Sequence, residues 1–317
     1  MAAPAQTVEG KRRARARRWE HLGAYLFLLP NLLGFLVFTL VPVAAVGLLA
    51  FTRWGVIDRP QWVGLRNFVR LLSFHSEAGH TTANDPFFWQ YLGNTVFLML
   101  GLPLAVAGAL GLALLLNQRL RGMVAYRTIF FLPAVCSPVA VALLWKWIYA
   151  PDFGVLNYAL HMVGVANPPQ WLQSTTWAKP AFILMGLWTG IGGYNCVLYL
   201  AGLQGIPAEL YEAADLDGAG WWQKLRHITW PLLSPTTFFI VVMGVIGGFQ
   251  GGFTAAYMMT DGGPAGATTT LMYYIYRMAF QWFEMGYAAA IAVVLFLLVF
   301  GFTLLNWYLG KRVVHYQ

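Results

Sequence analysis

The first residues that could do chemistry are three carboxylates spaced at every third position. Glu209, Glu212 and Asp215 occur in the segment AELYEAADLDGAG, and a helix would place all three on one face. Pro207 suits the first turn of such a helix, and Gly218 suits the position just after its end. An acidic helical face of this kind is predicted to bind another protein through charge complementarity.

A second short helix is predicted after this glycine. Trp221, Leu225 and Ile228 recur at the spacing of one helical face. No cluster of nucleophiles, acid–base groups or metal ligands accompanies the two helices in the sequence. Two short helices joined at a glycine therefore predict a compact docking surface and no catalytic site.

Two long apolar stretches carry neutral polar and aromatic side chains of the kind that bind sugars. They offer two amides, four aromatic residues and a glycine, namely Trp188, Tyr194, Asn195, Phe249, Gln250, Gly252 and Phe253. Amides can hydrogen-bond sugar hydroxyls, aromatic faces can cover the C–H faces of sugar rings, and glycine lets a ligand approach the backbone. These residues predict a substrate pathway. Close packing between helices is the alternative explanation for the glycines and for the two amides.

Six stretches without Asp, Glu, Lys, Arg or His can position these residues. They cover residues 24–50, 88–116, 128–145, 180–203, 229–260 and 285–310. About 20 apolar residues cross a bilayer core, so each stretch can span once, the third only if it extends toward residue 150. The chain is 59% hydrophobic and 10% charged, whereas a soluble protein has about 25% charged residues. The sequence predicts an all-α integral membrane protein with six transmembrane helices in residues 24–310.

The absence of charged residues from these stretches narrows the possible mechanisms. Ion-driven transporters usually carry ionisable groups within the bilayer, and intramembrane hydrolases need paired carboxylates or metal-binding histidines. An ion-coupled transporter stays open as an alternative, because hydroxyls and carbonyls alone can coordinate Na⁺. The sequence also contains no G-x-x-x-x-G-K-[ST] loop, so no ATP-binding P-loop is expected. We therefore expect a transport protein that is not an enzyme and has no metal site or cofactor of its own.

Lysine and arginine are distributed unevenly between the predicted loops. Segments 1–23, 117–127, 204–228 and 311–317 hold 13 basic residues in 66 positions, and the other loops hold 7 in 95. The positive-inside rule then predicts that both termini and the loop 204–228 are cytoplasmic. The run KRRARARR beside the first stretch is predicted to fix the topology and contact anionic lipid, not nucleic acid.

Several stretches resemble the membrane subunits of ABC importers. Residues 212–219, EAADLDGA, followed by Ile228 and Pro231, are similar to the EAA loop of these subunits. Three further stretches resemble the carbohydrate branch of the family, namely GLRNFVRLL (64–72), AGLQGIPAELYEAA (201–214) and TDGGPAGATTTLMYYIYRMAF (260–280). Together the matches run from about residue 24 to residue 310, with their spacing largely kept.

This resemblance implies a function for the loop. In the family the EAA loop is the coupling helix, which inserts into a cleft of a cytoplasmic ATPase. In this sequence, the resemblance assigns the coupling role to Glu212, Ala213, Ala214, Asp217, Gly218 and Ala219. The tails 1–23 and 311–317 would flank the permease domain, and the coupling loop 204–228 would lie between spans 4 and 5.

The resemblance also implies partners and a substrate class. The expected partners are a second homologous permease subunit, an ATPase dimer that binds ATP and Mg²⁺, membrane lipid and an extracytoplasmic sugar-binding protein. The expected location is a bacterial or archaeal cytoplasmic (inner) membrane. The expected substrate is a sugar, a di- or oligosaccharide, carried by alternating access. Glycerol phosphate or its diesters, and an ion-coupled secondary transporter, are the alternatives.

Overall fold

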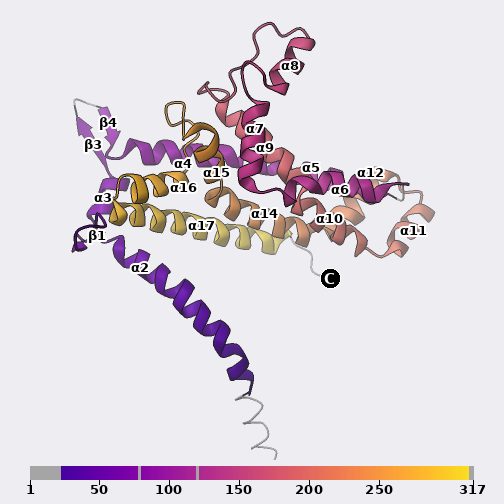
Figure 1. Ribbon diagram of the computed structural model, residues 1–317. Helices are drawn as coiled ribbons and strands as arrows, with labels where there is room; N and C mark the ends of the chain where they lie inside the picture. The colour runs from indigo at the N-terminus through magenta and orange to yellow at the C-terminus, as the bar shows by residue number, and fades with distance from the viewer. Residues whose placement is uncertain (1–22, 78–79, 119–120, 314–317) are drawn as a thin grey trace, which may run out of the picture.

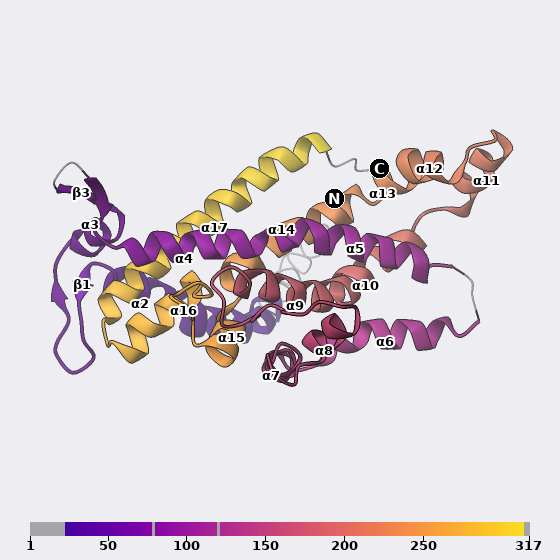
Figure 2. The ribbon, with the colours of Figure 1, turned by 90° about the horizontal axis from the view of Figure 1, so that it is seen from above.

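The computed structural model describes residues 23–77, 80–118 and 121–313 of the chain. Nearly all of the basic tail 1–23 and the last four residues of the tail 311–317 lie outside the described residues. Long helices run side by side along one axis and form the body of the fold (Figure 1, Figure 2). The helical elements, with π-helical turns marked η, are η1 (Leu36–Leu40), α2 (Val41–Leu49), α3 (Arg66–Leu72), α4 (Pro86–Met99), α5 (Gly101–Leu116), α6 (Met123–Val135), α7 (Pro138–Ile148), α8 (Val155–Met162), α9 (Ala178–Gly192), α10 (Tyr194–Gln204), α11 (Ala208–Leu216), α12 (Trp221–Lys224), η2 (Leu225–Thr229), α13 (Trp230–Leu232), α14 (Ser234–Gln250), α15 (Phe253–Ala255), η3 (Ala256–Thr260), α16 (Leu271–Tyr276), η4 (Arg277–Gln281) and α17 (Met285–Val313).

Five of the six predicted spans correspond to helices long and apolar enough to cross a bilayer. These helices are Gly23–Leu49, Pro86–Leu116, Ala178–Gln204, Ser234–Thr260 and Met285–Gly310. We call them spans 1, 2, 4, 5 and 6. Each overlaps one predicted stretch, because apolar length is a local property of the sequence.

The third predicted stretch, 128–145, is not one straight helix, which corrects the sequence-based expectation. α6 and α7, together called span 3, meet at an angle of 99°. Cys136 has extended backbone angles (φ −70°, ψ 143°) and ends α6, and Pro138 starts α7. A residue that precedes proline avoids the helical region, so Ser137 keeps the two helices apart.

The sequence predicted an all-α protein, but the fold also contains short strands. Two antiparallel hairpins, β1 (Thr52–Arg53) with β2 (Gln61–Trp62) and β3 (Phe74–Glu77) with β4 (His80–Ala83), lie between spans 1 and 2. Pairing between short strands satisfies backbone groups that no helix satisfies there. The hairpins lie at one end of the bundle and α11 lies at the other (Figure 1, Figure 2). We call these the hairpin end and the α11 end.

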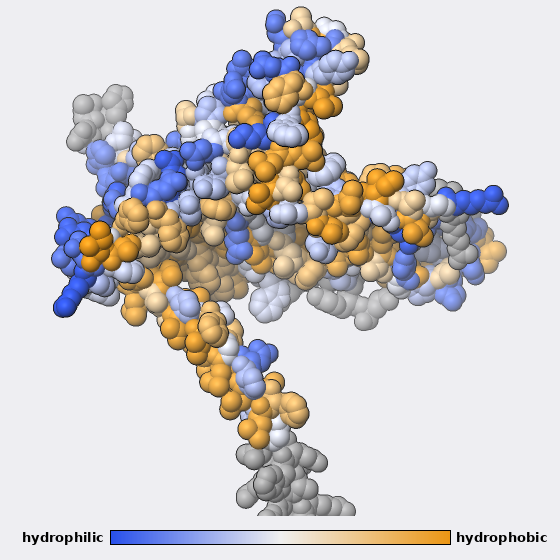
Figure 3. Space-filling view, viewed as in Figure 1, coloured by the Kyte–Doolittle hydropathy of each residue, from blue (hydrophilic) through white to orange (hydrophobic). Residues whose placement is uncertain are grey.

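Span 1 stands away from the rest of the chain. Within this chain, none of the apolar window of Gly23–Leu49 is buried, and Phe27 and Phe38 are 89% and 81% exposed. Figure 3 shows apolar side chains along this isolated helix. It meets the bundle at its C-terminal end, where Leu49 and the following residue, Ala50, pack with Ala289 and Ala290 of α17. Lipid or another protein must therefore cover most of span 1.

Small residues let the remaining spans approach one another closely. In α5, Ala109 and Ala113 are fully buried against spans 4 and 5. At Gly108, an added Cβ would lie 2.7 Å from Cδ1 of Ile191, so a larger residue there would force the Ile191 side chain to move. Small residues at helix interfaces commonly serve this purpose in membranes.

Candidate translocation cavity and docking loop

Spans 3, 4 and 5 are all interrupted, and a cavity of about 670 Å³ lies where the interruptions meet. The breaks fall at Cys136–Ser137, at Gly193 and at Gly251–Gly252. Residues on either side of each break line the cavity. Irregular backbone within a membrane protein is tolerated where it is covered by protein or faces a water-filled space. The three breaks therefore lie where such backbone is tolerated, around a shared cavity.

Glycine is required at the break in span 5. Gly252 has φ +80°, a conformation that side chains rarely adopt. In addition, a Cβ at Gly252 would lie only 2.6 Å from Cγ2 of Thr270. Glycine at this position therefore allows the backbone turn, and it lets Thr270, in the segment before α16, lie close to span 5.

Five of the seven predicted pathway residues line the cavity. They are Tyr194, Asn195, Gln250, Gly252 and Phe253. Phe249 instead lies in the core at 1% exposure, with its ring centroid 5.3 Å from that of Phe302. Trp188 lies outside the lining and packs edge-on against Trp145. Neighbouring residues on a helix point about 100° apart, which separates Phe249 from Gln250.

The two amides of the cavity have no protein partner. Within the described part of the chain, the carboxamides of Asn195 and Gln250 make no hydrogen bond, although both line the cavity. Gln250 is exposed and Asn195 is half-buried. Both groups are therefore available to a ligand hydroxyl or to a second protein chain.

Sequence reasoning missed contributions to the lining from outside spans 4 and 5. Thr270 comes from the segment before α16, and Met99 is the last residue of α4. Three successive threonines, 268–270, after a glycine-rich loop were the signal that could have singled out Thr270. Among the described residues, every side chain in the lining is uncharged. The lining is mostly apolar, with a few amide and hydroxyl groups, as is common for small-molecule sites.

A set of buried hydrogen bonds holds the segment 261–270 against span 2. Asn94 donates from Nδ2 to the carbonyl oxygens of Gly266 (2.8 Å) and Thr269 (2.9 Å). The hydroxyl of Thr95 accepts from the N–H of Leu271 at 3.1 Å. Asn94 and Thr95 are 2% and 1% exposed. These bonds place Thr270 at the cavity.

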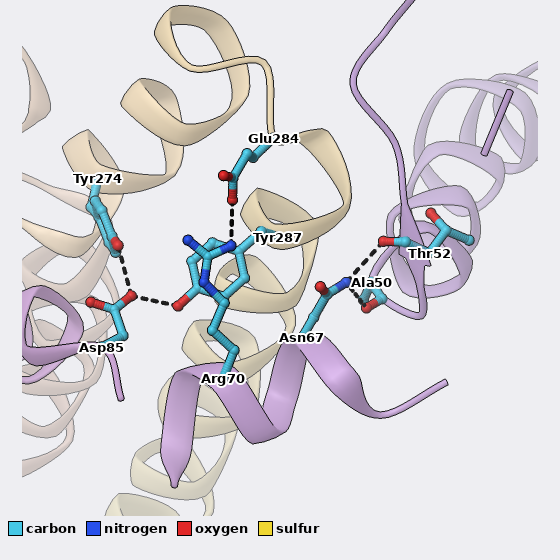
Figure 4. A network of polar contacts seen from close by, with 8 residues as sticks. All are labelled: Ala50, Thr52, Asn67, Arg70, Asp85, Tyr274, Glu284 and Tyr287. Carbon is cyan, nitrogen blue, oxygen red and sulfur yellow. Dashed lines mark hydrogen bonds and ion pairs between the residues drawn. The ribbon is translucent and has the colours of Figure 1, made fainter. Parts of the chain in front are cut away.

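A buried carboxylate joins spans 2 and 6 to α16 at the hairpin end (Figure 4). Asp85 is 6% exposed and caps α4 by accepting the N–H of Phe88 at 3.1 Å. The phenols of Tyr274 (2.7 Å) and Tyr287 donate to its other oxygen. Burial, together with the hydrogen bond to Asp85, raises the pKa of Tyr274. Asp85 was not predicted, although an Asp-Pro pair before an apolar run is a typical helix start.

Two residues of α3 extend this network. Arg70 forms an ion pair with Glu284 at 2.7 Å. Asn67 donates from Nδ2 to the carbonyl oxygens of Ala50 and Thr52, both at 2.9 Å. Figure 4 shows that α3 thereby connects the end of span 1 to the start of span 6. The hairpin end is a polar assembly that fixes the ends of these spans.

At the other end, α11 and α12 form the helix pair that the sequence predicted. α11 ends at Leu216, Asp217 is its C-cap, and Gly218 follows with φ +74°. The N–H of Ala219 donates to the carbonyl oxygen of Ala214 at 2.9 Å, and the N–H of Gly218 donates to the backbone carbonyl oxygen of Asp215 at 3.1 Å. These two bonds are those of a Schellman motif, in which the left-handed position favours glycine.

The surface of this pair is largely uncovered in the chain. Glu212 and Ala213 are exposed, as are Asp217 and Gly218, and α11 contains no buried residue. Ala214 and Ala219 are half-buried. Apolar side chains add to the exposed surface, namely Leu216 (90%), Trp221 (66%) and Trp222 (63%). Exposed apolar groups beside acidic ones are typical of a protein-binding surface.

Residues 25–315 match the family described as binding-protein-dependent transport system inner membrane component. The chain belongs to this family. The sequence-based identification of an importer permease is thereby confirmed. This permease is 36% identical over 314 residues to the probable ABC transporter permease protein YesP of Bacillus subtilis (strain 168), covering 98% of this chain and 97% of YesP.

Two further similarities concern sugar transport in other proteins. The lactose transport system permease protein LacF of Rhizobium radiobacter is 35% identical over 307 residues, covering 95% of this permease and 98% of LacF. A chain in the crystal structure of a bacterial alginate ABC transporter in complex with an alginate pentasaccharide-bound periplasmic protein is 26% identical, with a TM-score of 0.80. The match covers 95% of this permease and 97% of that chain.

Proposed function

We propose that this permease forms part of the translocation pathway of an ATP-driven ABC importer for a neutral sugar, a di- or oligosaccharide. The observation that carries the proposal is the uncharged cavity between three interrupted spans, with two unpartnered amides in its lining. Its volume of about 670 Å³ falls within the range of about 300–1,000 Å³ that is common for small-molecule sites. The likeness to a lactose permease supports a sugar.

The importer is proposed to contain a second, homologous permease subunit. The uncovered surface of span 1 supports this partner, because an apolar helix that its own chain leaves bare can pack on another. An ATPase dimer binds ATP and Mg²⁺ and contacts α11 on the cytoplasmic side. An extracytoplasmic binding protein delivers the sugar, as the periplasmic protein bound to the related alginate transporter suggests.

Transport in this proposal proceeds by alternating access. ATP binding closes the ATPase dimer and displaces α11, which opens the pathway toward the binding protein. Sugar then enters the cavity, where Asn195 and Gln250 hydrogen-bond its hydroxyls and Phe253 lies against its ring. Hydrolysis by the partner returns the spans to the inward-open state. The differential affinity of ATP for the two states of the ATPase drives the change.

The alternative substrate and the alternative mechanism receive less support. Glycerol phosphate or its diesters are anions, and no Lys or Arg lines the described cavity. An ion-coupled mechanism would not need the binding protein and ATPase that this family's transport systems use.

The topology can be tested with single cysteines. In a background with Cys136 and Cys196 replaced by alanine, cysteines at Ile57 and Ala265 should react with an impermeant thiol reagent added to whole cells. A cysteine at Gly220 should react only after the membrane is opened. The basis is the distribution of basic residues, 13 against 7. Labelling of position 220 in intact cells would contradict both the orientation and ATPase docking at α11.

The pathway can be tested at Gln250. In proteoliposomes with the complete importer, Gln250→Ala should raise the KM for sugar uptake about threefold to tenfold, because one hydrogen bond to the sugar is lost. ATPase stimulation by the loaded binding protein should remain. Uptake of labelled di- and trisaccharides, divided by the amount of assembled complex, measures the effect.

The matched control is Asn306→Ala. Asn306 is a half-buried amide of span 6 that lies outside the cavity, and its Nδ2 donates to the carbonyl oxygen of Phe302 in the same helix. This variant should transport like the wild type. Uptake per complex that is unchanged in Gln250→Ala for every sugar would remove Gln250 from the pathway.

A further inference from the structure

The segments that connect α11 to the rest of the chain contain glycine. It contains no buried residue. Gly205 lies just before it, and Gly218 and Gly220 follow it. Glycine has the greatest backbone freedom of any residue. These connections by themselves would let α11 turn without moving a span.

Two side-chain contacts bridge α11 to the helix that leads into span 5. The phenol of Tyr211 lies 2.8 Å from the hydroxyl of Thr229. The carboxylate of Asp215 forms an ion pair with Lys224 at 2.7 Å. Both partners belong to the continuous helical segment α12–η2–α13, which precedes α14.

Of the two residues that α11 contacts, Thr229 and Lys224, Thr229 is held more rigidly. Thr229 is 4% exposed, and its Oγ1 donates to the carbonyl oxygen of Lys224 at 3.3 Å. Because Thr229 uses its proton there, Tyr211 is the donor between the two hydroxyls. The ion pair is partly exposed, with Asp215 at 62%, and such pairs contribute little.

Span 5 in turn is firmly packed where it begins. Leu233 is fully buried, and a Cβ at Gly202 would lie 2.8 Å from its Cδ2. The phenol of Tyr199 in α10 donates to Thr237 at 3.1 Å. Span 5 then runs to the break at Gly251–Gly252 beside the cavity. A displacement applied at Thr229 therefore reaches the cavity through packed helix.

We propose that the Tyr211–Thr229 hydrogen bond, assisted by the Asp215–Lys224 ion pair, is a coupling clamp that makes α11 and span 5 move as one body. This proposal rests on the proposed function, in which the ATPase displaces α11. Tyr211 and Thr229 are positioning residues. Without the clamp, the ATPase still docks and hydrolyses ATP, but α11 swings at its glycines and span 5 follows incompletely.

The test measures sugar molecules imported per ATP hydrolysed by the complete importer in proteoliposomes. Tyr211→Phe removes only the hydroxyl, and Thr229→Val keeps the shape of the side chain. Each variant should copurify with the ATPase at wild-type yield and lower the sugar-to-ATP ratio about threefold to tenfold. The double variant should be no worse than either single variant, because both remove the same bond. Lys224→Met should lower the ratio by about twofold or less.

The matched control is Tyr126→Phe, which removes an exposed phenol from α6 at the same end of the bundle. Its ratio should equal that of the wild type. A wild-type ratio in both Tyr211→Phe and Thr229→Val would overturn the clamp and leave the proposed function intact. Loss of the ATPase from Tyr211→Phe would also overturn it, since the phenol would then serve docking. A wild-type complex that imports no sugar with ATP would refute the proposed function instead.

Discussion

Gly218→Val is expected to lower ATP-driven sugar uptake at least about tenfold. Gly218 has φ +74°, and a β-branched residue in this conformation carries strain of about 1–3 kcal/mol. An added Cβ would meet no atom within 4 Å, so a clash does not contribute. The strain is relieved if the turn changes, which displaces α11 from α12 and breaks the surface offered to the ATPase. Copurification of the ATPase and uptake by the reconstituted importer measure the effect.

Gly218→Asn is the matched control for this prediction. Asparagine adds a side chain of similar size but tolerates the left-handed conformation. It should keep most of the uptake and of the bound ATPase. Equal losses in both variants would mean that the side chain itself, and not the turn, disturbs docking. Full activity of Gly218→Val would exclude this turn from coupling.

Asp85→Leu is expected to cause the largest loss of stability, about 3 kcal/mol or more. The change leaves the phenols of Tyr274 and Tyr287 unpaired in the protein interior and removes the cap of α4. Each buried group without a partner costs about 1–3 kcal/mol, and loss of a cap costs about 1 kcal/mol. The network joins three elements, so its loss should also lower the yield of assembled complex. Thermal unfolding in detergent measures the effect.

Asp58→Leu is the control for Asp85. Asp58 is exposed between β1 and β2, at the same end of the bundle. A surface substitution of this kind usually changes stability by less than about 0.5 kcal/mol. If Asp85→Leu unfolded at the same temperature as this control, the buried network would not be a determinant of stability.

The two ends of the permease have different physical characters. At the hairpin end, buried polar contacts such as those of Asp85 and Asn94 fix the spans to one another. At the α11 end, α11 contains no buried residue. Regions with few buried contacts move more readily than cores do. This difference agrees with the function proposed above, in which the ATPase moves one end and the binding protein docks on the other.

The sequence by itself determined most of the long helices. Apolar length located five spans, because crossing a bilayer needs about 20 such residues in succession. The helix that ends before Gly218 was also predictable, since its signals lie within one turn of its end. The break in span 3 was not, because Pro138 within an apolar run is compatible with a kink as well as with a sharp bend.

Only the tertiary structure decided which side chains meet. It placed Gln250 at the cavity and Phe249 in the core, although both occur in the same apolar run. It brought Thr270 to the cavity through Asn94, whose bond to Thr269 joins positions 175 residues apart. Local patterns specify a helix and its ends. The face that a helix turns to a cavity depends on long-range packing, which no short stretch of sequence contains.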